Sequence, residues 1–309
     1  MSALLLSAIL MQTSSLEDIW LPRDLTTPSL GASVSPLSDE TEWMKAEGIP
    51  LPDLRGVVAA VDAFGPLGDA GCRKVTVISK ISGRSIRDAE SFNEAVLSLS
   101  LQEDAEIQGY SLAQDRNGDP SWLPATWHVR PARFRETVME SLVRTRDDAN
   151  GITTYRHNSS PAKYTEGDGV FVYLMKRDSG TVILRCRYQH PIPDVKTRPR
   201  YWKAVGFGLV GAMLNEPVVA NSPESIHLID GREWIDDVAD ERVRKKFSKL
   251  LSAEAPHAGV LLQHRDNPEG RSQWVDEKVH VNPVQLHAIR TALQAYAIMV
   301  REQERSERK

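Results

Sequence analysis

Residues 56–61 read Gly-Val-Val-Ala-Ala-Val, an uninterrupted apolar run that precedes the turn residues Gly65-Pro66. A short run of this kind predicts a strand that is buried on both faces. A second strand is predicted at 75–81 (Val-Thr-Val-Ile-Ser-Lys-Ile), because β-branched residues dominate it and Ser82-Gly83-Arg84 has the composition of a turn. These two strands predict a β-sheet at the centre of the first compact region.

The segment that follows predicts a helix and then a strand pair. Asp88 suits the N-cap position. Apolar residues then recur with the three- and four-residue spacing of one buried helix face: Phe92, Ala95, Val96 and Leu99. Strands are predicted at 105–112 and 126–129, with a polar loop at 115–120 between them. The order of strand, strand, helix, strand and strand predicts a small α+β module.

Several short motifs of this region resemble, in the same order, those of bacterial PDZ domains. They are Gly56-Val57-Val58, Gly65-Pro66-Leu67 with Ala70-Gly71-Cys72, Val77-Ile78, Ser82-Gly83-Arg84 and Phe92. The resemblance covers residues 43–130. It implies a small PDZ-like β-barrel or sandwich with helices, and a function in binding a protein or peptide partner.

The resemblance also implies where a peptide would bind. In the family, a peptide adds a strand to the sheet, and backbone N–H groups of a loop bind its C-terminal carboxylate. The implied groove lies between a strand and loop formed by Trp43, Met44, Lys45 and Ala46 and a helix that carries Phe92, Ala95, Val96 and Leu99. Lys45 stands where the family has a glycine, which argues against carboxylate binding by this loop. Packing in the core is the other interpretation of the four helix residues.

Residues 1–40 carry two different compositions. The apolar run at 2–11 has the length of a signal-peptide core, but no Lys or Arg precedes it and no clear cleavage site follows. Two localisations therefore remain open, export to the cell envelope and a cytoplasmic protein with a buried or disordered start. The run is about half of the ~20 residues that a transmembrane helix needs. Residues 21–40 are rich in Pro, Ser and Thr and predict a linker.

The sequence divides the rest of the chain into three parts. The PDZ-like domain is expected at 41–131 and a connecting helix at 132–146, where Phe134 and Val138 have helical spacing. A second α+β domain with a largely antiparallel sheet is expected at 147–309. Its clearest feature is a hairpin of 170–175 and 182–188. Further strands are predicted at 151–155, 204–210, 225–229 and 259–263, and a helix at 239–251.

A long C-terminal helix closes the chain. Asn282 is the predicted N-cap, Pro283 the first helical residue and Gln285 the partner of Asn282 in a capping box. The predicted apolar stripe is Leu286, Ile289, Leu293 and Tyr296, and the charged residues after 300 are expected to fray. Residues 147–300 weakly resemble a β-rich domain of uncharacterised bacterial proteins through Asp147-Asp148, Gly151-Ile152-Thr153, Ser159-Ser160-Pro161 and the paired strands. That resemblance implies one α+β unit and no activity.

The motifs tested for chemistry predict no catalytic residue, metal or cofactor. Gly206-x-Gly208-x-x-Gly211 fits the dinucleotide fingerprint, but Pro217 leaves no room for the helix that must follow it, so a glycine-rich strand is expected. The loop Asp115-x-Asn117-x-Asp119 lacks the glycine and glutamate of a calcium loop. The eight histidines form no His-Glu-x-x-His motif, although a metal site built from distant residues stays possible.

Composition narrows the classes of partner. The chain has 309 residues, with 38 Lys and Arg against 42 Asp and Glu and a net charge of −4. This balance gives no general attraction for nucleic acid. Cys72 and Cys186 are too few for a disulfide framework and are expected to be separate buried residues.

Three functional hypotheses remain open. The first is a non-enzymatic, envelope-associated adaptor that binds a protein or peptide, for example a C-terminal peptide, through its PDZ-like module. The second is a hydrolase whose PDZ-like module presents substrate to an active site in the second domain. A convergent group of His, Asp and Ser side chains in a pocket would favour this hypothesis. The third is a structural or assembly role.

Overall fold

The computed structural model describes the backbone of residues 22, 24–51, 55–114, 119–160, 169–191, 201–209, 212–213, 231–237, 258–265, 275–280 and 282–307. Side chains are described in 22, 24–51 (except residues 42 and 46), 55–114, 119–160, 171–184 and 282–307. The apolar start of the chain, the predicted strand 225–229, the predicted helix 239–251 and most of the loop 115–120 lie outside the described residues.

The first sheet is antiparallel and has the strand order β2-β3-β4-β6-β7. Its strands are β2 (Ala32–Pro36), β3 (Val57–Val61), β4 (Val75–Ile81), β6 (Ala105–Gln114) and β7 (Pro120–Val129), and the short β5 (Arg84–Ser85) pairs with β4. The predicted strands of the first region are confirmed. Every residue of β3 is buried. Its alternate residues Val57, Ala59 and Val61 join one hydrophobic core, and Val58 and Ala60 on the opposite face are buried as well, so both faces of the strand are apolar.

Helix α4 (Ala89–Leu97) confirms the predicted helix and its cap. Oδ1 of Asp88 accepts a 2.8 Å hydrogen bond from the backbone N–H of Ser91, and the Ser91 hydroxyl lies 3.1 Å from the N–H of Asp88. The shorter helices of this region are η1 (Leu37–Glu40, a 3₁₀ helix), α2 (Thr41–Ala46), α3 (Pro66–Asp69) and α5 (Phe134–Glu140). Strand β1 (Pro28–Ser29) pairs with β8 (Ala132–Arg133).

The prediction of a linker at 21–40 is wrong for its second half. Residues 32–36 form β2 at the edge of the first sheet, and 28–29 form β1. The prolines do not prevent this pairing, because Pro28 begins one strand and Pro36 ends the other, where a missing N–H costs little. The first folded region therefore begins before residue 41.

The predicted connecting helix at 132–146 is only partly correct. Helix α5 ends at Glu140, and β9 (Leu142–Asp147) pairs with β10 (Ile152–His157) from Leu142↔His157 to Asp147↔Ile152. The segment continues beyond Val143 with Arg144, Thr145 and Arg146. Pairing with β10 thus overrides the helical spacing of the apolar residues.

The second sheet is also antiparallel and has the order β15-β12-β11-β10-β9. Its remaining strands are β11 (Gly169–Arg177), β12 (Val182–Pro191) and β15 (Gly231–Asp237). The predicted hairpin is confirmed, since β11 and β12 pair from Gly169↔Gln189 to Lys176↔Val182. Strands β9 and β15 are additions that the sequence did not predict.

A third sheet has the order β14-β13-β16-β17. It contains β13 (Tyr201–Leu209), β14 (Ala212–Met213), β16 (Ala258–Arg265) and β17 (Val275–His280). Gly206 and Gly208 lie in β13, which pairs with β14 through Gly208↔Met213 and Leu209↔Ala212. The expected glycine-rich strand is confirmed, and residues 212–213, where a dinucleotide-binding helix would begin, form a strand.

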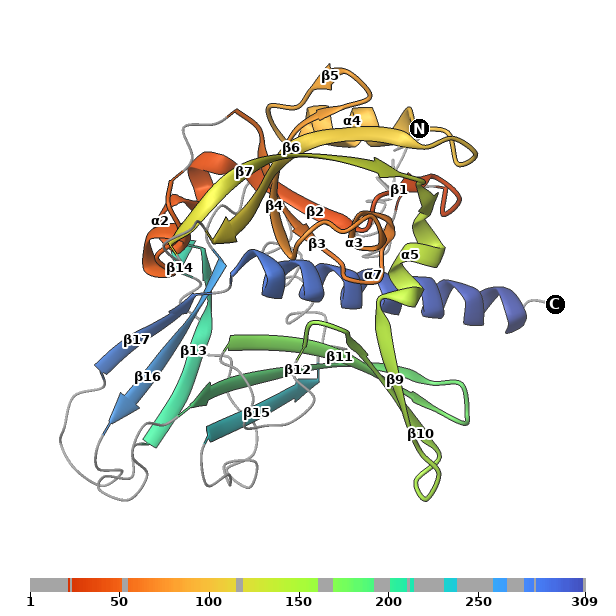
Figure 1. Cartoon of the computed structure of the whole chain (residues 1–309). Coiled ribbons are helices and arrows are strands. Elements are labelled where there is room, and N and C mark those ends of the chain that lie inside the picture. Colours follow the sequence, from red (N-terminus) through yellow and green to blue (C-terminus); the bar gives the residue numbers. More distant parts are fainter. Residues whose placement is uncertain are drawn as a thin grey trace, which may run out of the picture.

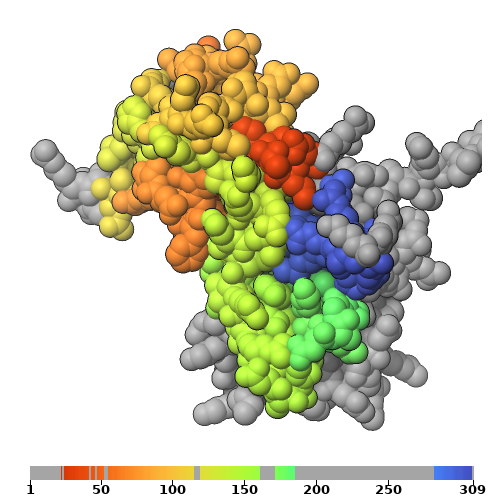
Figure 2. Space-filling model, turned by 90° about the vertical axis from the view of Figure 1, so that its right-hand side faces the viewer, coloured from red at the N-terminus to blue at the C-terminus, as the bar shows by residue number. Residues whose placement is uncertain are grey.

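Helix α7 (Pro283–Glu307) lies between the first and second sheets (Figure 1). Its C-terminal end reaches the surface of the molecule between these two regions (Figure 2). It contacts β2, β3 and α5 on one side and β10, β11 and β12 on the other. The predicted capping box is confirmed, because Gln285 N–H donates to Asn282 Oδ1 at 2.8 Å and Asn282 N–H donates to Gln285 Oε1 at 3.3 Å.

Of the predicted stripe of α7, Ile289 and Leu293 are buried but Leu286 and Tyr296 are only half-buried, and the buried surface spreads to other positions because both sides of the helix are covered. The buried set includes Ala288, Ile289, Ala292, Leu293, Ala295, Ala297 and Ile298. The small alanines allow sheets to approach the helix from opposite sides. The prediction that the chain frays after residue 300 is wrong, since the helix continues to Glu307 and Glu302 forms a 2.6 Å ion pair with Arg135 of α5.

Helices and antiparallel sheets together confirm the predicted α+β class, including the C-terminal helix. Within the described residues, no helix has both the length and the hydropathy to cross a membrane.

Candidate functional site

The first half of the groove implied by the PDZ resemblance is a helix. Residues 43–46 belong to α2, where the resemblance implied a strand and a loop. Met44 is fully buried and Lys45 is exposed. At the C-terminal end of the helix, the N–H of Glu47 donates to the carbonyl of Trp43, and the N–H of Gly48 donates to the carbonyl of Lys45. Helical backbone of this kind does not form the loop of free N–H groups that binds a carboxylate in the family.

The second half of the implied groove belongs to the core. Phe92, Ala95 and Val96 are buried in α4, and Leu99 packs against the same cluster from just beyond the helix. Figure 1 shows α2 and α4 well apart on the first sheet. The structure therefore does not bring the two predicted halves together.

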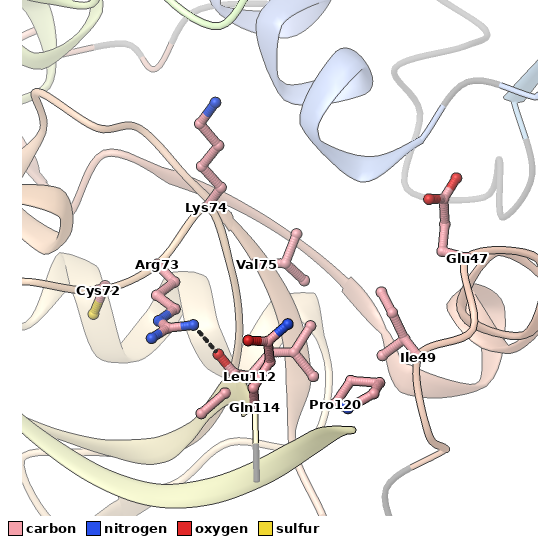
Figure 3. A pocket seen from close by; sticks show the side chains of 10 residues that line it. Glu47, Ile49, Cys72, Arg73, Lys74, Val75, Leu112, Gln114 and Pro120 are labelled. Carbon is pink, nitrogen blue, oxygen red and sulfur yellow. Dashed lines mark hydrogen bonds between the residues drawn. The ribbon is translucent and has the colours of Figure 1, made fainter. Parts of the chain in front are cut away.

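A different cavity of about 930 Å³ opens in the first region (Figure 3). It lies where the start of β4, the end of β6 and the start of β7 meet the loop after α2. Its lining residues are Glu47, Ile49, Cys72, Arg73, Lys74, Val75, Leu112, Ala113, Gln114 and Pro120. The loop after α2 is fixed in place, because the indole N–H of Trp122 in β7 donates a 2.8 Å hydrogen bond to the carbonyl of Pro50.

The cavity combines one oriented cation with apolar side chains, and Glu47, Lys74 and Gln114 add further polar groups to its lining. Arg73 donates from Nη1 to the carbonyl of Leu112 at 2.7 Å, which holds the guanidinium against the end of β6 (Figure 3). Lys74 also lines the cavity, but its side chain points away from Arg73 in the same view. The apolar contribution comes from Ile49, Val75, Leu112 and Pro120. An arginine beside an apolar surface suits a ligand that joins a carboxylate to an apolar group.

Cys72 does not provide a nucleophile for this cavity. Burial raises the pKa of its thiol to about 12, and the side chain forms no disulfide. Because the thiolate is the reactive form, the thiol is inert near neutral pH. This agrees with the expectation of a buried, unpaired Cys72, whereas the side chain of Cys186 lies outside the described residues.

A second candidate site is a buried cluster of Asp62, His157 and His287, which we call the Asp–His–His cluster. Asp62 directly follows β3, His157 is the last residue of β10, and His287 lies near the start of α7. One side-chain ligand atom from each residue lies within 4.8 Å of the other two. The residues are 2%, 1% and 6% exposed, so three distant parts of the chain place polar groups in one dry interior.

Local hydrogen bonds orient each member of the cluster. The Nδ1 atoms of His157 and His287 lie 2.7 Å from the hydroxyls of Ser159 and Ser33, respectively. Oδ1 of Asp62 accepts from the side chain of Asn158 at 2.6 Å and from the N–H of Phe64 at 3.2 Å.

Both histidines are kept neutral by their surroundings. Desolvation lowers the pKa of His157, the charge of Lys74 lowers it further, and Asp62 opposes them. Desolvation likewise lowers the pKa of His287, with smaller effects from His157 and Arg290. Neutral imidazole is the form that binds metals.

Serine, histidine and aspartate side chains therefore converge, but not in the arrangement of a hydrolase. The hydroxyls of Ser33 and Ser159 contact Nδ1 atoms, whereas His157 Nε2 lies 3.8 Å from Asp62 Oδ2, beyond hydrogen-bond range. In a serine triad, the carboxylate and the serine contact opposite nitrogens of one imidazole at short range. All three residues of the cluster are also buried.

Neither site was predicted from the sequence. The cavity residues come from four separated segments that share no motif, although Cys72 belongs to a segment that carries the PDZ resemblance and Ile49 follows the implied groove segment 43–46. The Asp–His–His cluster joins residues from widely separated parts of the chain. The sequence analysis had only left open that histidines far apart in the sequence could form a metal site.

No protein-family model matches the chain, and no curated protein matches it in sequence. The PDZ resemblance of residues 43–130 stays an expectation from the sequence. Function is therefore inferred from the two sites.

Proposed function

We propose that this is a non-enzymatic protein that binds a peptide or protein segment ending in a free carboxylate. The cavity beside Arg73 carries the proposal, because it places an oriented guanidinium next to an apolar surface. The carboxylate would pair with Arg73, and the last side chain of the peptide would lie against Val75 and Ile49.

The contact energies expected between the cavity and a peptide C-terminus indicate weak but selective binding. Charge-assisted hydrogen bonds contribute about 1.5–3 kcal/mol each where they are shielded from water. Arg73 is exposed, so its contribution lies at or below the lower end of this range. Burial of an apolar terminal side chain contributes a further ~1.5–3 kcal/mol at most.

The proposed mode differs from strand addition. Near the cavity, β6 is already paired with β7, from Leu112↔Trp122 to Gln114↔Pro120. Prolines at positions 120 and 124 remove donors from the outer strand β7. The peptide would therefore bind by its terminus rather than as an additional strand.

A binding screen of the full chain against peptides with free and amidated C-termini tests this proposal. We expect free-carboxylate peptides with an apolar last residue to bind up to about tenfold more tightly than their amidated forms. Arg73→Gln should remove that preference. Arg84→Gln is the matched control, because Arg84 is also exposed but lies on β5, outside the cavity lining. Equal binding of both peptide forms, or equal effects of the two variants, would refute the proposal.

A hydrolase is the second candidate, because Ser, His and Asp side chains converge in the Asp–His–His cluster. Its burial and its long Asp62 to His157 separation favour the binding function instead. Peptide and ester substrates incubated with the full chain would distinguish the two. Turnover that His157→Gln abolishes would support the hydrolase.

A further inference from the structure

The Asp–His–His cluster contains two buried nitrogen atoms that lack a partner. Nε2 of His157 and Nε2 of His287 form no hydrogen bond, although both atoms are removed from water. A buried polar atom without a partner costs about 1–3 kcal/mol. Two such atoms close to one carboxylate indicate a missing group that would contact all three residues.

The geometry fits a metal ion of small radius. The two imidazole rings meet edge to face with centroids 5.3 Å apart, and Oδ2 of Asp62 lies 3.8 Å from Nε2 of His157. Ligand atoms about 2.0–2.1 Å from a tetrahedral zinc ion are about 3.3 Å from one another. One ligand atom of each residue lies within 4.8 Å of the other two, so the three residues would need to approach one another by at most about 1.5 Å, which side-chain rotation can supply.

The groups around the cluster match the support that metal ligands have in proteins. Each histidine has a serine hydroxyl at Nδ1, and a hydroxyl can accept from an Nδ1–H, so both contacts are compatible with the tautomer that leaves the Nε2 lone pair free. For His157, this tautomer would give up a weaker 3.2 Å contact from the N–H of Ser159 to Nδ1. The side-chain hydrogen bonds that Asp62 forms with described residues both end on Oδ1, and Oδ2 is the oxygen that lies 3.8 Å from Nε2 of His157.

We propose that Asp62, His157 and His287 bind one zinc ion, which joins the first sheet, the second sheet and helix α7. Two imidazole nitrogens and one carboxylate oxygen favour zinc over calcium or magnesium, which prefer oxygen ligands. The net charge of the three residues also favours a cation, because two neutral histidines and one carboxylate carry a net negative charge. In the described part of the chain, Asp62 has no Lys or Arg ion-pair partner. With three protein ligands, the fourth position of the tetrahedron would be taken by a water molecule.

The test uses full-length protein without a histidine tag, stripped of metal with a chelator and then titrated with zinc against a chromophoric competitor. We expect one zinc ion per chain. His287→Gln should weaken binding by more than about a hundredfold, since even the loss of an outer partner of a ligand costs 10–100-fold. His128→Gln is the control, because His128 is exposed on β7 and should leave the affinity unchanged.

Two measurements on the unaltered chain keep the test independent of how the variants fold. Zinc should raise the melting temperature of the stripped protein by several degrees, because it binds the folded state alone. Cobalt should bind at the same stoichiometry and give the visible absorption of a four-coordinate site. The proposal is overturned if zinc neither binds stoichiometrically nor shifts the melting temperature. Equal weakening by His287→Gln and His128→Gln would also overturn it, since surface histidines would then explain the binding.

Discussion

The side-chain amide of Asn158 donates a 2.6 Å hydrogen bond to Oδ1 of Asp62, across 96 residues of sequence. Asn158 follows the second sheet's β10, and Asp62 follows β3 of the first sheet. The bond therefore links, in the interior, the two regions that the sequence had divided into separate domains. Helix α7 reinforces this link because it packs against both sheets.

Loss of this hydrogen bond should destabilise the whole chain. We expect Asn158→Ala to lower the free energy of unfolding by about 1–3 kcal/mol, because a buried carboxylate oxygen loses its shorter hydrogen bond. Urea denaturation followed by circular dichroism measures the change. Asn150→Ala is the control, since Asn150 bonds to Asp147 on the exposed turn between β9 and β10. Equal changes in the free energy of unfolding for the two variants would show that the Asn158–Asp62 hydrogen bond contributes no more to stability than an exposed one.

Close approach of two strands makes Gly109 essential to the first sheet. A Cβ at this position would overlap the carbonyl oxygen of Val77 in the neighbouring strand β4. We expect Gly109→Ala to cost about 3 kcal/mol or more, because backbone atoms must move. Gly48→Ala should cost only about 1–2 kcal/mol, since its φ is +67° but nothing lies within 4 Å of the added carbon. Thermal unfolding of both variants checks this order, and a reversed order would contradict the described register of β4 and β6.

The raised pKa of Cys72 predicts slow alkylation in the folded protein. Thiolate forms in quantity only as the pH approaches about 12, so at pH 8 almost all of the thiol is protonated. In a Cys186→Ser background, we expect iodoacetamide to react at least about tenfold more slowly in buffer than in urea. Mass spectrometry over a time course measures both rates. Similar rates in the two conditions would mean that Cys72 is accessible and ionised more readily than its burial implies.

The N-cap of α7 offers a local test of helix stability. Asn282→Ala removes the acceptor for the N–H of Gln285, and we expect a loss of about 1 kcal/mol in the free energy of unfolding. Asn282→Asp should retain most of the stability, since a carboxylate accepts the same bond and suits the positive end of the helix. Chemical denaturation compares the three proteins. An unchanged midpoint for Asn282→Ala would show that the cap contributes nothing.

Local signals predicted the elements whose conformation their own residues determine. The apolar run of β3 and the capping residues Asp88 and Asn282 were correct because strand burial and N-caps act within a few residues. The hairpin of β11 and β12 was correct for the same reason, since its turn joins adjacent strands.

Elements that depend on distant partners were missed. Residues 32–36 have a linker-like composition, yet they form β2 because β3 offers an edge with which to pair. Leu142 continues a helical pattern, yet it pairs with His157 in a sheet. Pairing energy from another part of the chain overrode local preference in both places.

The two candidate sites could not be predicted from the sequence for a related reason. The cavity depends on how the ends of β4, β6 and β7 meet, and no motif in the sequence encodes that meeting. The histidines of the Asp–His–His cluster lie on β10 and α7, so they have no regular spacing. The PDZ resemblance indicated the first region, but α2 formed where it implied a carboxylate loop.

Hydrogen exchange with and without bound peptide tests the central claim, that a carboxylate-ended peptide binds in the cavity beside Arg73. The full chain would be measured with the tightest free-carboxylate peptide from the screen and with its amidated form. We predict that the free-carboxylate peptide slows amide exchange at 47–49, 72–75 and 112–114, and that the amidated peptide does so far less. Protection confined to residues 89–99 of α4 and its C-terminal end, with none around Arg73, would contradict the claim.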